Sequence, residues 1–315
     1  MRIIEWNCQG AFRKKYSRIL SFNPDILVIS ECESENKLKF GVLTPTPNDF
    51  LWYGVNENKG IGIFSYSDYK FELLKIFNPR FKYIIPIKVT GKETSFLLFA
   101  IWTQENKQRP NERYIGQIWL ALSYYSNLLS LPVILTGDFN SNTVWDRKNR
   151  VGNHSDVVNV LNNNKIYSLY HRQEHIQQGF EIYPTFYLHR KRNKPYHIDY
   201  FFASEVLVKN GFQITIGQAD NWLDVSDHVP LILDFKPDVF ADFENSISEF
   251  IKLKLDKLSI FTKSKFSTLI NNIIREANCL EKYPATIKYH PQREKLIQKL
   301  EKLIEIDKLL IEINQ

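Results

Sequence analysis

The chain has 315 residues, of which 43% are hydrophobic and 14% aromatic, and its formal net charge at pH 7 is +6. This length and composition allow one large packed domain and a smaller second one, since single cores rarely grow beyond about 250–300 residues. No stretch approaches the roughly 18–20 uninterrupted apolar residues of a membrane span, which excludes a helical membrane protein. The mild positive charge suits a polyanionic substrate without requiring one.

The three cysteines, Cys8, Cys32 and Cys279, are odd in number and widely spaced. This arrangement is neither a disulfide framework nor a zinc-site pattern, and it suits a reducing compartment. The N-terminus also has no positive region followed by an apolar run, so no secretory signal is expected. We therefore predict a cytoplasmic protein.

Strands and helices alternate through the first part of the chain. Apolar or β-branched runs predict strands, and apolar residues at helical spacing predict helices. The expected strands are Arg2–Asn7, Asp25–Ser30, Gly60–Ser65, Phe71–Phe77, Phe81–Val89, Ser95–Trp102, Pro132–Thr136, Tyr196–Ala203 and Val229–Asp234, and the expected helices are Lys15–Phe22, Asn111–Leu129 and Val157–Asn164. The strands fall into two halves with helices interposed, which predicts an α/β protein. Its expected architecture is a four-layer α/β/β/α sandwich of two packed mixed sheets.

The composition changes after Lys236–Pro237, where amphipathic patterns predict an all-α extension. The expected helices are Phe240–Leu258, Lys265–Leu280 and Gln292–Ile313. We therefore expect one domain over residues 1–236 and a helical bundle or coiled-coil-like arm over residues 237–315. Three roles remain open for this extension: self-association, docking of a protein partner, or packing back on the first domain.

Polar residues recur where the expected strands end. They form the sets Trp6–Asn7, Ser30–Glu31, Thr136–Asn142, His197–Tyr200 and Ser226–His228. Taken singly, such residues at a strand end are ordinary turn formers. The five sets in this order, however, resemble the endonuclease/exonuclease/phosphatase superfamily, the fold of pancreatic deoxyribonuclease and the exonuclease III-type abasic-site nucleases. The resemblance spans roughly residues 1–234 and implies a metal-dependent phosphoesterase.

The resemblance implies a metal site for Mg²⁺ or Mn²⁺. Glu31 and Asn7 match metal-site positions of the superfamily, and Asp227 would approach the metal or its waters. Oxygen ligands are what Mg²⁺ requires, because it is a hard cation that keeps several waters. Glu33, two residues after Glu31, either supports the metal ligands from behind or is a loop charge, and we favour the loop charge.

The resemblance also implies the catalytic groups. Asp138 and Asn140 match the Gly-Asp-x-Asn motif, in which the carboxylate activates the attacking water and the amide holds that water or a phosphate oxygen. Asp199 and His228 match a dyad in which the carboxylate keeps the imidazole cationic, so that the ring stabilises the phosphorane. The implied reaction is in-line hydrolysis without a covalent enzyme intermediate.

The sequence departs from the family pattern at one position. After the strand Ser95–Trp102 the superfamily carries a His or Tyr near the scissile phosphate, and Trp102 occupies this place here. An indole can donate a hydrogen bond but cannot act as an acid or base, and Gln104 can donate as well. Either His154 or another residue substitutes, or the group is missing. A helix N-cap cluster is the alternative role for His154.

Two basic runs lie beside catalytic strand ends and are candidate phosphate contacts. They are Arg13–Lys14–Lys15 and the run from His189 to Lys194, which includes Lys191 and Arg192. A third basic run, from Arg147 to Arg150, follows the Gly-Asp-x-Asn motif. Trp102 and Trp145, which neighbour motif residues, are candidate stacking surfaces for bases. The expected function is hydrolysis of nucleic acid, with a DNA endonuclease favoured. The alternatives are a phosphatase or phosphodiesterase of a small molecule or lipid headgroup, and a non-catalytic binding module.

Overall fold

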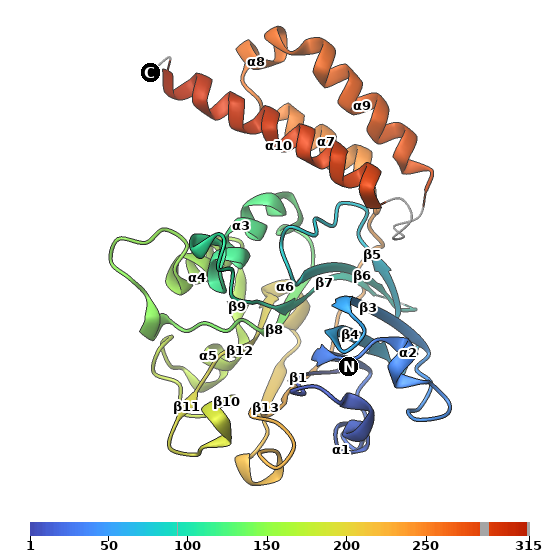
Figure 1. Ribbon diagram of the computed structural model, residues 1–315, viewed down its shortest axis with the longest axis vertical. Coiled ribbons are helices and arrows are strands. Elements are labelled where there is room, and N and C mark those ends of the chain that lie inside the picture. Colours follow the sequence, from blue (N-terminus) through green and yellow to red (C-terminus); the bar gives the residue numbers. More distant parts are fainter. Residues whose placement is uncertain (93, 284–289, 314–315) are drawn as a thin grey trace. The chain divides into compact units, whose positions relative to one another are not determined.

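The computed structural model describes residues 1–92, 94–283 and 290–313 (Figure 1). The chain divides into two compact units. The first contains Met1–Glu72 and Phe81–Phe243, and the second contains Leu73–Arg80 and Glu244–Gln315. An early segment that the sequence assigned to the first domain therefore belongs with the C-terminal helices. The boundary at residue 236 stays a prediction.

Two mixed sheets form the centre of the first unit, and each has six strands within the described residues. One sheet has the order β13-β14-β1-β2-β4-β3 and the other β5-β6-β7-β8-β12-β9. In the first sheet the strands are β1 (Arg2–Asn7), β2 (Ile26–Cys32), β3 (Asp49–Asn56), β4 (Lys59–Ser65), β13 (Phe212–Ile216) and β14 (Leu231–Phe235). In the second they are β5 (Lys70–Leu73), β6 (Ile84–Thr90), β7 (Ser95–Trp102), β8 (Val133–Asp138), β9 (Ile166–Ser168) and β12 (Asp199–Ser204). A separate hairpin pairs β10 (Phe186–Tyr187) with β11 (Pro195–Tyr196).

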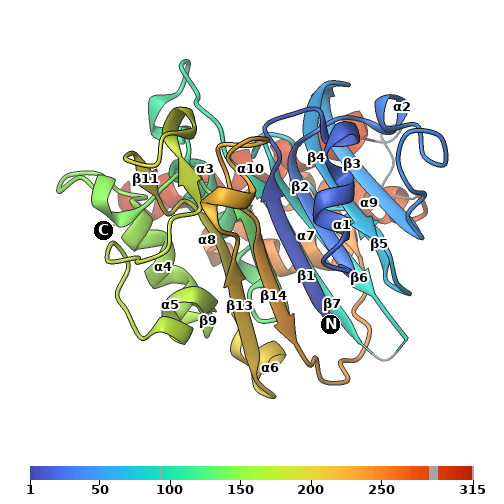
Figure 2. The same cartoon turned by 90° about the horizontal axis from the view of Figure 1, so that it is seen from below.

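Both sheets combine parallel and antiparallel pairs. In the first sheet, β1 is parallel to β2 and antiparallel to β14, and Figure 2 shows β1, β14 and β13 side by side. In the second, β7 is parallel to β8 while β12 is antiparallel to it. Strands β1 and β2 of one sheet contact β8 of the other. The predicted α/β sandwich of two packed mixed sheets is therefore confirmed.

Helices cover the outer faces of the two sheets. In the first unit the α-helices are α1 (Tyr16–Leu20), α2 (Glu35–Leu38), α3 (Ile115–Tyr124), α4 (His154–Asn163), α5 (Leu169–Glu174) and α6 (Glu205–Val208). Helix α1 contributes Ile19, and α2 contributes Leu38, to a buried cluster that includes Ile4 and Trp6 of β1. Because side chains alternate along a strand, Glu5 and Asn7 point to the opposite face of β1, toward the second sheet.

Several expected elements have different bounds in the structure. The strand expected over 71–77 ends at Leu73, because the next residues leave the sheet and join the second unit. The helix expected over 111–129 is α3 with a 3-10 turn on either side, Pro110–Glu112 and Ser126–Leu128. Strands β3, β9 and β13 were not expected. They are short or only half-buried, and therefore lack a strong apolar run.

The second unit contains four α-helices within its described residues, where three were expected. They are α7 (Ile247–Asp256), α8 (Ile260–Lys265), α9 (Ser267–Glu281) and α10 (His290–Ile313). The additional helix, α8, lies between the first two expected helices. The Ser259 side chain caps its N-terminus and also donates to Asp307 of α10. Helix α9 contacts both α7 and α10. None of the helices in the described ranges combines the length and apolar character that crossing a membrane requires.

The early segment is tied into the second unit by Glu281 at the end of α9. Its carboxylate forms an ion pair with Lys75 and accepts hydrogen bonds from Ser246 Oγ at 3.1 Å and Ser248 N at 3.0 Å. Lys75 N also donates to Asn245 Oδ1 at 2.8 Å. The C-terminal helices are therefore built around a piece of chain that lies between β5 and β6.

Candidate active site

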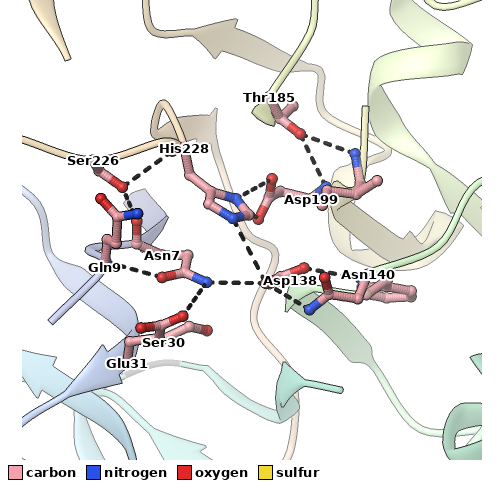
Figure 3. A network of polar contacts seen from close by, with 12 residues as sticks. Asn7, Gln9, Ser30, Glu31, Asp138, Asn140, Thr185, Asp199, Ser226 and His228 are labelled. Carbon is pink, nitrogen blue, oxygen red and sulfur yellow. Dashed lines mark hydrogen bonds and ion pairs between the residues drawn. The ribbon is translucent and has the colours of Figure 1, made fainter. Parts of the chain in front are cut away.

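All five polar sets meet at one edge of the two sheets, since Glu31 also contacts Asn7. Asp138 ends β8 and lies opposite Asp199 of β12 in register, while Asn7 ends β1 in the facing sheet. His228 comes from the loop before β14 and lies between the two aspartates (Figure 3). The structure thus brings these side chains together, and their catalytic roles stay predictions.

Asp138 is the centre of the hydrogen-bond network. Its Oδ1 accepts from Asn140 N at 2.9 Å, and its Oδ2 accepts from Asn140 Nδ2 at 2.8 Å and from Asn7 Nδ2 at 3.0 Å. Burial, followed by the nearby charge of Asp199, raises the pKa of Asp138 to about 7. A carboxylate with this pKa is suited to a general base at neutral pH.

The structure explains why the Gly-Asp-x-Asn motif begins with glycine. Gly137 has φ of +132°, and a Cβ atom there would lie 1.9 Å from the carbonyl oxygen of Ile101 on β7. Only glycine allows this backbone conformation and this close approach of the two strands. Asn140 has φ of +47°, in the left-handed region that asparagine tolerates well. The motif thus turns the chain so that Asn140 folds back on Asp138.

Asp199 and His228 form the expected dyad. His228 Nδ1 lies 2.9 Å from Asp199 Oδ2 and 3.1 Å from Oδ1, and both side chains are buried. Two hydroxyl groups hold the backbone around the pair. Thr185 Oγ1 accepts from Asp199 N at 3.1 Å, and Ser226 Oγ accepts from His228 N at 3.1 Å while donating to Asn7 O at 2.7 Å.

The dyad keeps its imidazole charged. Burial alone would lower the pKa of His228, but the charges of Asp199 and Asp138 outweigh it and raise this pKa to about 9. The second ring nitrogen, Nε2, lies 3.9 Å from Asp138 Oδ2. An imidazolium N–H therefore points toward the carboxylate that would activate water, which suits stabilisation of a negatively charged transition state.

Glu31 lies at the mouth of this network on a β-bulge of β2. The register of the β2–β4 pair shifts between Ser30 and Cys32, and Glu31 has φ of +58°. Bulges re-aim a side chain beside many active sites. Here the Glu31 carboxylate forms an ion pair with Lys59 of β4 and accepts from Asn7 Nδ2 at 3.4 Å.

The donor set around Glu31 fits a hard divalent cation. The Glu31 carboxylate already binds one cation, the ammonium group of Lys59. Asp227 is half-buried nearby: burial raises its pKa, and the Glu31 charge adds to the rise. Two carboxylates whose charges repel are a suitable oxygen set for Mg²⁺ or Mn²⁺. Asn7 makes different contacts, because its Oδ1 accepts from Gln9 N at 3.0 Å and its amide nitrogen faces the carboxylates. A direct Asn7–metal bond stays a prediction.

Asp138, Asp199 and His228 are a second possible metal group, since one ligand atom from each lies within 4.8 Å of the others. Their charges argue against it. An imidazolium ring has no lone pair on Nε2 for a metal, and the two carboxylates already balance its charge and accept hydrogen bonds. A metal site at Glu31 stays a prediction.

The structure corrects the expectation for Trp102. Its indole is only 7% exposed and stacks on Tyr83 with ring centroids 5.1 Å apart. It is thus not an open platform for a base. Gln104 is half-buried, and its backbone carbonyl accepts from Tyr114 N at 2.9 Å.

Tyr114 is a residue that the sequence analysis missed. It precedes α3 with φ of +48°, is half-buried, and lines a cavity together with Asn140. Burial raises the pKa of Tyr114, with smaller contributions from Glu105 and Asp138. Nothing in the periodicity around position 114 marks it. The one available signal was a tyrosine in the polar segment that follows β7.

The predicted substrate contacts fall into two groups. Lys14, Lys191 and Trp145 are exposed, Trp145 by 46%. Arg13 and Arg192 instead form ion pairs with Glu33 and Asp220 respectively. Their contacts with substrate stay predictions.

The pairing of Arg13 also corrects the interpretation of Glu33. This residue is buried, and its Oε2 accepts from Arg13 N at 3.2 Å. Glu33 is therefore not a solvated loop charge. It ties the end of β2 to the segment that follows β1, next to the metal-site candidates.

His154 does not reach the catalytic centre. It begins α4, is fully buried, and its Nδ1 contacts Ser141 Oγ at 3.2 Å. Burial lowers the pKa of His154 to about 4, which keeps the ring neutral at physiological pH. The N-cap alternative is close to what the structure has: Asn153 and Asp156 form the capping box that begins α4, with His154 between them.

Two packed mixed sheets with a buried carboxylate–imidazole pair and a second buried carboxylate at one edge define a phosphoesterase. The chain belongs to the Endonuclease/Exonuclease/phosphatase family, whose model matches residues 4–228. This span includes every residue of the cluster from Asn7 to His228. No match was found among curated protein sequences.

Several solved structures have the same fold. An AP endonuclease from Archaeoglobus fulgidus has 18% identity and a TM-score of 0.52 over 75% of this chain and 99% of its own. The 3′ phosphatase NExo from Neisseria, bound to a product DNA hairpin, has 17% identity and a TM-score of 0.51 over 75% and 99%. The catalytic domain of Xenopus laevis APE2 has 15% identity and a TM-score of 0.52 over 78% and 94%. At these identities the likeness shows the fold alone.

Proposed function

We propose that the chain is a divalent-metal-dependent phosphodiesterase that hydrolyses nucleic acid, and that it acts as a DNA endonuclease. The observation that carries this proposal is the contact set of one imidazole: His228 is hydrogen-bonded to Asp199 and faces Asp138 at 3.9 Å. A base for water and a cation for the phosphorane are thereby held side by side before substrate arrives, which is the preorganisation that phosphoryl-transfer catalysis requires.

Each residue of the cluster has a distinct part in the proposed reaction. Asp138 orients the attacking water and takes its proton, because its pKa lies near 7. His228 donates to a non-bridging phosphate oxygen as negative charge builds up on it. Glu31 and Asp227 hold the metal, and Asn7 orients Glu31 by its hydrogen bond. When bound, the metal supplies Lewis-acid neutralisation of the phosphate.

The sequence alone identified no residue that would assist departure of the leaving group. We propose that Tyr114 supplies the hydrogen bond that the family's His or Tyr provides near the scissile phosphate. Tyr114 lines the same cavity as Asn140, which is hydrogen-bonded to Asp138. Trp102 cannot serve, since it is stacked on Tyr83.

Charge and relatives support DNA as the substrate. The chain carries a net charge of +6, and Lys14 and Lys191 are exposed beside the strand ends that carry the site. Solved proteins with this fold include an AP endonuclease and a 3′ phosphatase bound to a DNA hairpin. Exposed cations beside a phosphate-hydrolysing centre are the usual means of binding a nucleic acid backbone.

The proposal is tested by cleavage of supercoiled plasmid, an abasic oligonucleotide, single-stranded DNA and RNA, each with Mg²⁺, Mn²⁺ or EDTA. We expect metal-dependent nicking by wild type and loss of at least 100-fold in Asp138→Ala. Val151→Ala, at an exposed position, is the control for differences between protein preparations and should cut like wild type. Absence of cutting on every nucleic acid, combined with hydrolysis of a small phosphorylated molecule, would replace the nuclease by the small-molecule phosphatase.

We also propose that the C-terminal helices bind a second copy of the chain or a protein partner. Leu309 and Ile313 of α10 are 53% and 78% exposed, although Leu296 and Leu303 of the same helix are buried. A monomeric mass by light scattering at micromolar concentration would count against self-association.

The cytoplasmic location predicted from the cysteines stays a prediction; Cys8 and Cys32 are free and buried.

A further inference from the structure

A cavity of about 270 Å³ lies directly beside the catalytic cluster. Asn140, which is hydrogen-bonded to Asp138, forms one part of its wall. The cavity is many times larger than the roughly 30 Å³ that one water occupies in the liquid. It can therefore admit a tetrahedral oxyanion next to the reacting phosphate.

Three arginines line this cavity: Arg113, Arg147 and Arg150. Within the described part of the chain, none of the three has a carboxylate partner at salt-bridge distance. The one acidic residue of the wall is Asp146. Its two carboxylate oxygens accept from the backbone N–H groups of His154 at 2.8 Å and Ser155 at 3.0 Å, at the start of α4. Positive charge is therefore left in excess inside the cavity.

Arg150 shows this excess most clearly. Its Nη2 atom is buried and has no hydrogen-bond partner among the described residues. Burial, together with the like charges of Arg113 and Arg147, lowers the pKa of Arg150. A buried donor without a partner is costly, and so is the crowding of three cations. An anion in the cavity would offset this crowding of positive charge.

The loop that carries two of the arginines is held in place. Asn153 Nδ2 donates to the carbonyl oxygens of Arg147 and Arg150, both at 2.9 Å, and its Oδ1 accepts from Arg147 N at 3.1 Å. The backbone positions of these arginines are thus set before any ligand binds. Such preorganisation lowers the entropic cost of binding.

We propose that this cavity is a subsite for a second phosphate group of the substrate, one that flanks the scissile phosphodiester in the same nucleic acid strand. The inference rests on the proposed nuclease function. Guanidinium groups bind phosphate oxygens in a bidentate manner, which a solvated lysine does not. Occupation of the subsite would fix the register of the strand over Asp138, so the subsite would select the bond that is cut.

The test uses DNA duplexes with one cleavage site, in which single phosphates around the scissile bond are replaced by neutral methylphosphonates. We expect one position at which the replacement lowers kcat/KM of wild type about tenfold. Arg150→Gln should lower kcat/KM on unmodified DNA to a similar extent. In this variant the methylphosphonate at that position should cause no further loss of kcat/KM. Lys148→Gln removes the same charge from an exposed residue of the same loop, outside the cavity wall. The kcat/KM of this variant should stay within twofold of wild type, and the methylphosphonate at that position should still lower it about tenfold.

A binding measurement separates this proposal from the nuclease proposal. Millimolar inorganic phosphate, added with EDTA, should raise the Tm of wild type and of Lys148→Gln but not that of Arg150→Gln. Without phosphate, Arg150→Gln should melt no lower than wild type, because it removes a buried donor that has no partner. A lower Tm would assign Arg150 a structural role instead.

The outcomes are distinct. If wild type cuts DNA while Arg150→Gln and Lys148→Gln behave alike in both assays, the subsite is overturned and the nuclease stands. If wild type cuts no nucleic acid but phosphate raises its Tm only when Arg150 is present, the phosphate site stands and the nuclease proposal fails.

Discussion

His228 Nε2 lies 3.9 Å from Asp138 Oδ2, while Nδ1 of the same ring is hydrogen-bonded to Asp199 Oδ2 at 2.9 Å. One imidazole thus joins two carboxylates that end neighbouring strands of one sheet. The longer distance exceeds that of a hydrogen bond. The Nε2–H group is therefore available to an oxygen of the substrate while it remains electrostatically coupled to the base.

This coupling predicts a bell-shaped dependence of kcat/KM on pH. Activity should rise as Asp138 ionises near pH 7 and fall as His228 loses its proton near pH 9, with both values belonging to the coupled cluster. Asp199 raises both pKa values, so Asp199→Asn should move both limbs toward lower pH, besides lowering the maximum. A profile whose limbs do not move in Asp199→Asn would contradict this assignment.

Tyr114→Phe should lower kcat on DNA by about 10- to 100-fold, a range that covers the loss of one hydrogen bond made to the transition state. The binding of DNA should change little, because the ring is kept. Single-turnover kinetics with saturating enzyme measures this step. Trp102→Phe is the control, since it alters a ring that is stacked on Tyr83. Equal effects in both variants would remove Tyr114 from the reaction.

Metal affinity should respond in opposite directions to two substitutions at one ion pair. Glu31→Gln removes a ligand and should weaken Mn²⁺ binding at least tenfold. Lys59→Gln removes the ammonium that competes for the same carboxylate, and should tighten binding about two- to fivefold, the range of a partly exposed ion pair. Calorimetric titration without DNA measures both. If His228→Gln abolishes binding and Glu31→Gln does not, the metal lies at the Asp–His cluster instead.

The buried side chain of Glu5 leads to a prediction about the stability of the fold. Its side chain is 1% exposed, and neither carboxyl oxygen has a hydrogen-bond partner among the described residues. Burial, with the charges of Asp199 and Asp138, raises the pKa of Glu5 well above its usual value. Glu5→Met should therefore raise the free energy of unfolding by about 1–3 kcal/mol, the desolvation cost of one unsatisfied polar group.

The advantage of Glu5→Met should widen with pH. The unfolded chain releases the Glu5 proton near pH 4.5, whereas the folded chain retains it to higher pH, so wild type loses stability relative to the variant as the pH rises above 4.5. Urea unfolding at pH 5 and pH 8 measures the difference. A difference that stays constant between these pH values would contradict the raised pKa.

Two buried histidines predict sensitivity to acid. Burial lowers the pKa of His154 and of His197 to about 4 each, from 6.5. The unfolded chain therefore takes up protons between pH 6.5 and 4 that the folded chain does not, and the free energy of unfolding falls as the pH falls through this window. Each ring accounts for on the order of 3 kcal/mol at full extent.

His154→Gln isolates one of these two contributions. The variant has no titratable group at this position, so its free energy of unfolding should fall less steeply between pH 6.5 and 4 than that of wild type. The slope is the measurement, since loss of the contact with Ser141 lowers the variant's stability at every pH. Parallel curves for the two proteins would mean that His154 titrates normally in the folded chain.

The sequence by itself determined the fold class and the centre of the site. Strands such as β2 and β8 are buried along most of their length and are therefore continuous apolar runs. Their ends carry Glu31 and Asp138 in motifs that are local in sequence. Because strand ends meet at a sheet edge, residues at those ends were predictable partners.

Only the tertiary structure decided which residues surround that centre. Tyr114 and the arginine cavity come from loops whose conformation no periodicity encodes, and Arg113 and Arg150 meet although 37 positions (150 − 113) separate them. The sequence predicted an open stacking surface at Trp102, but the indole is covered by Tyr83, which directly precedes β6. Contacts of this kind depend on how loops and sheets pack together, and local sequence patterns carry no information on that packing.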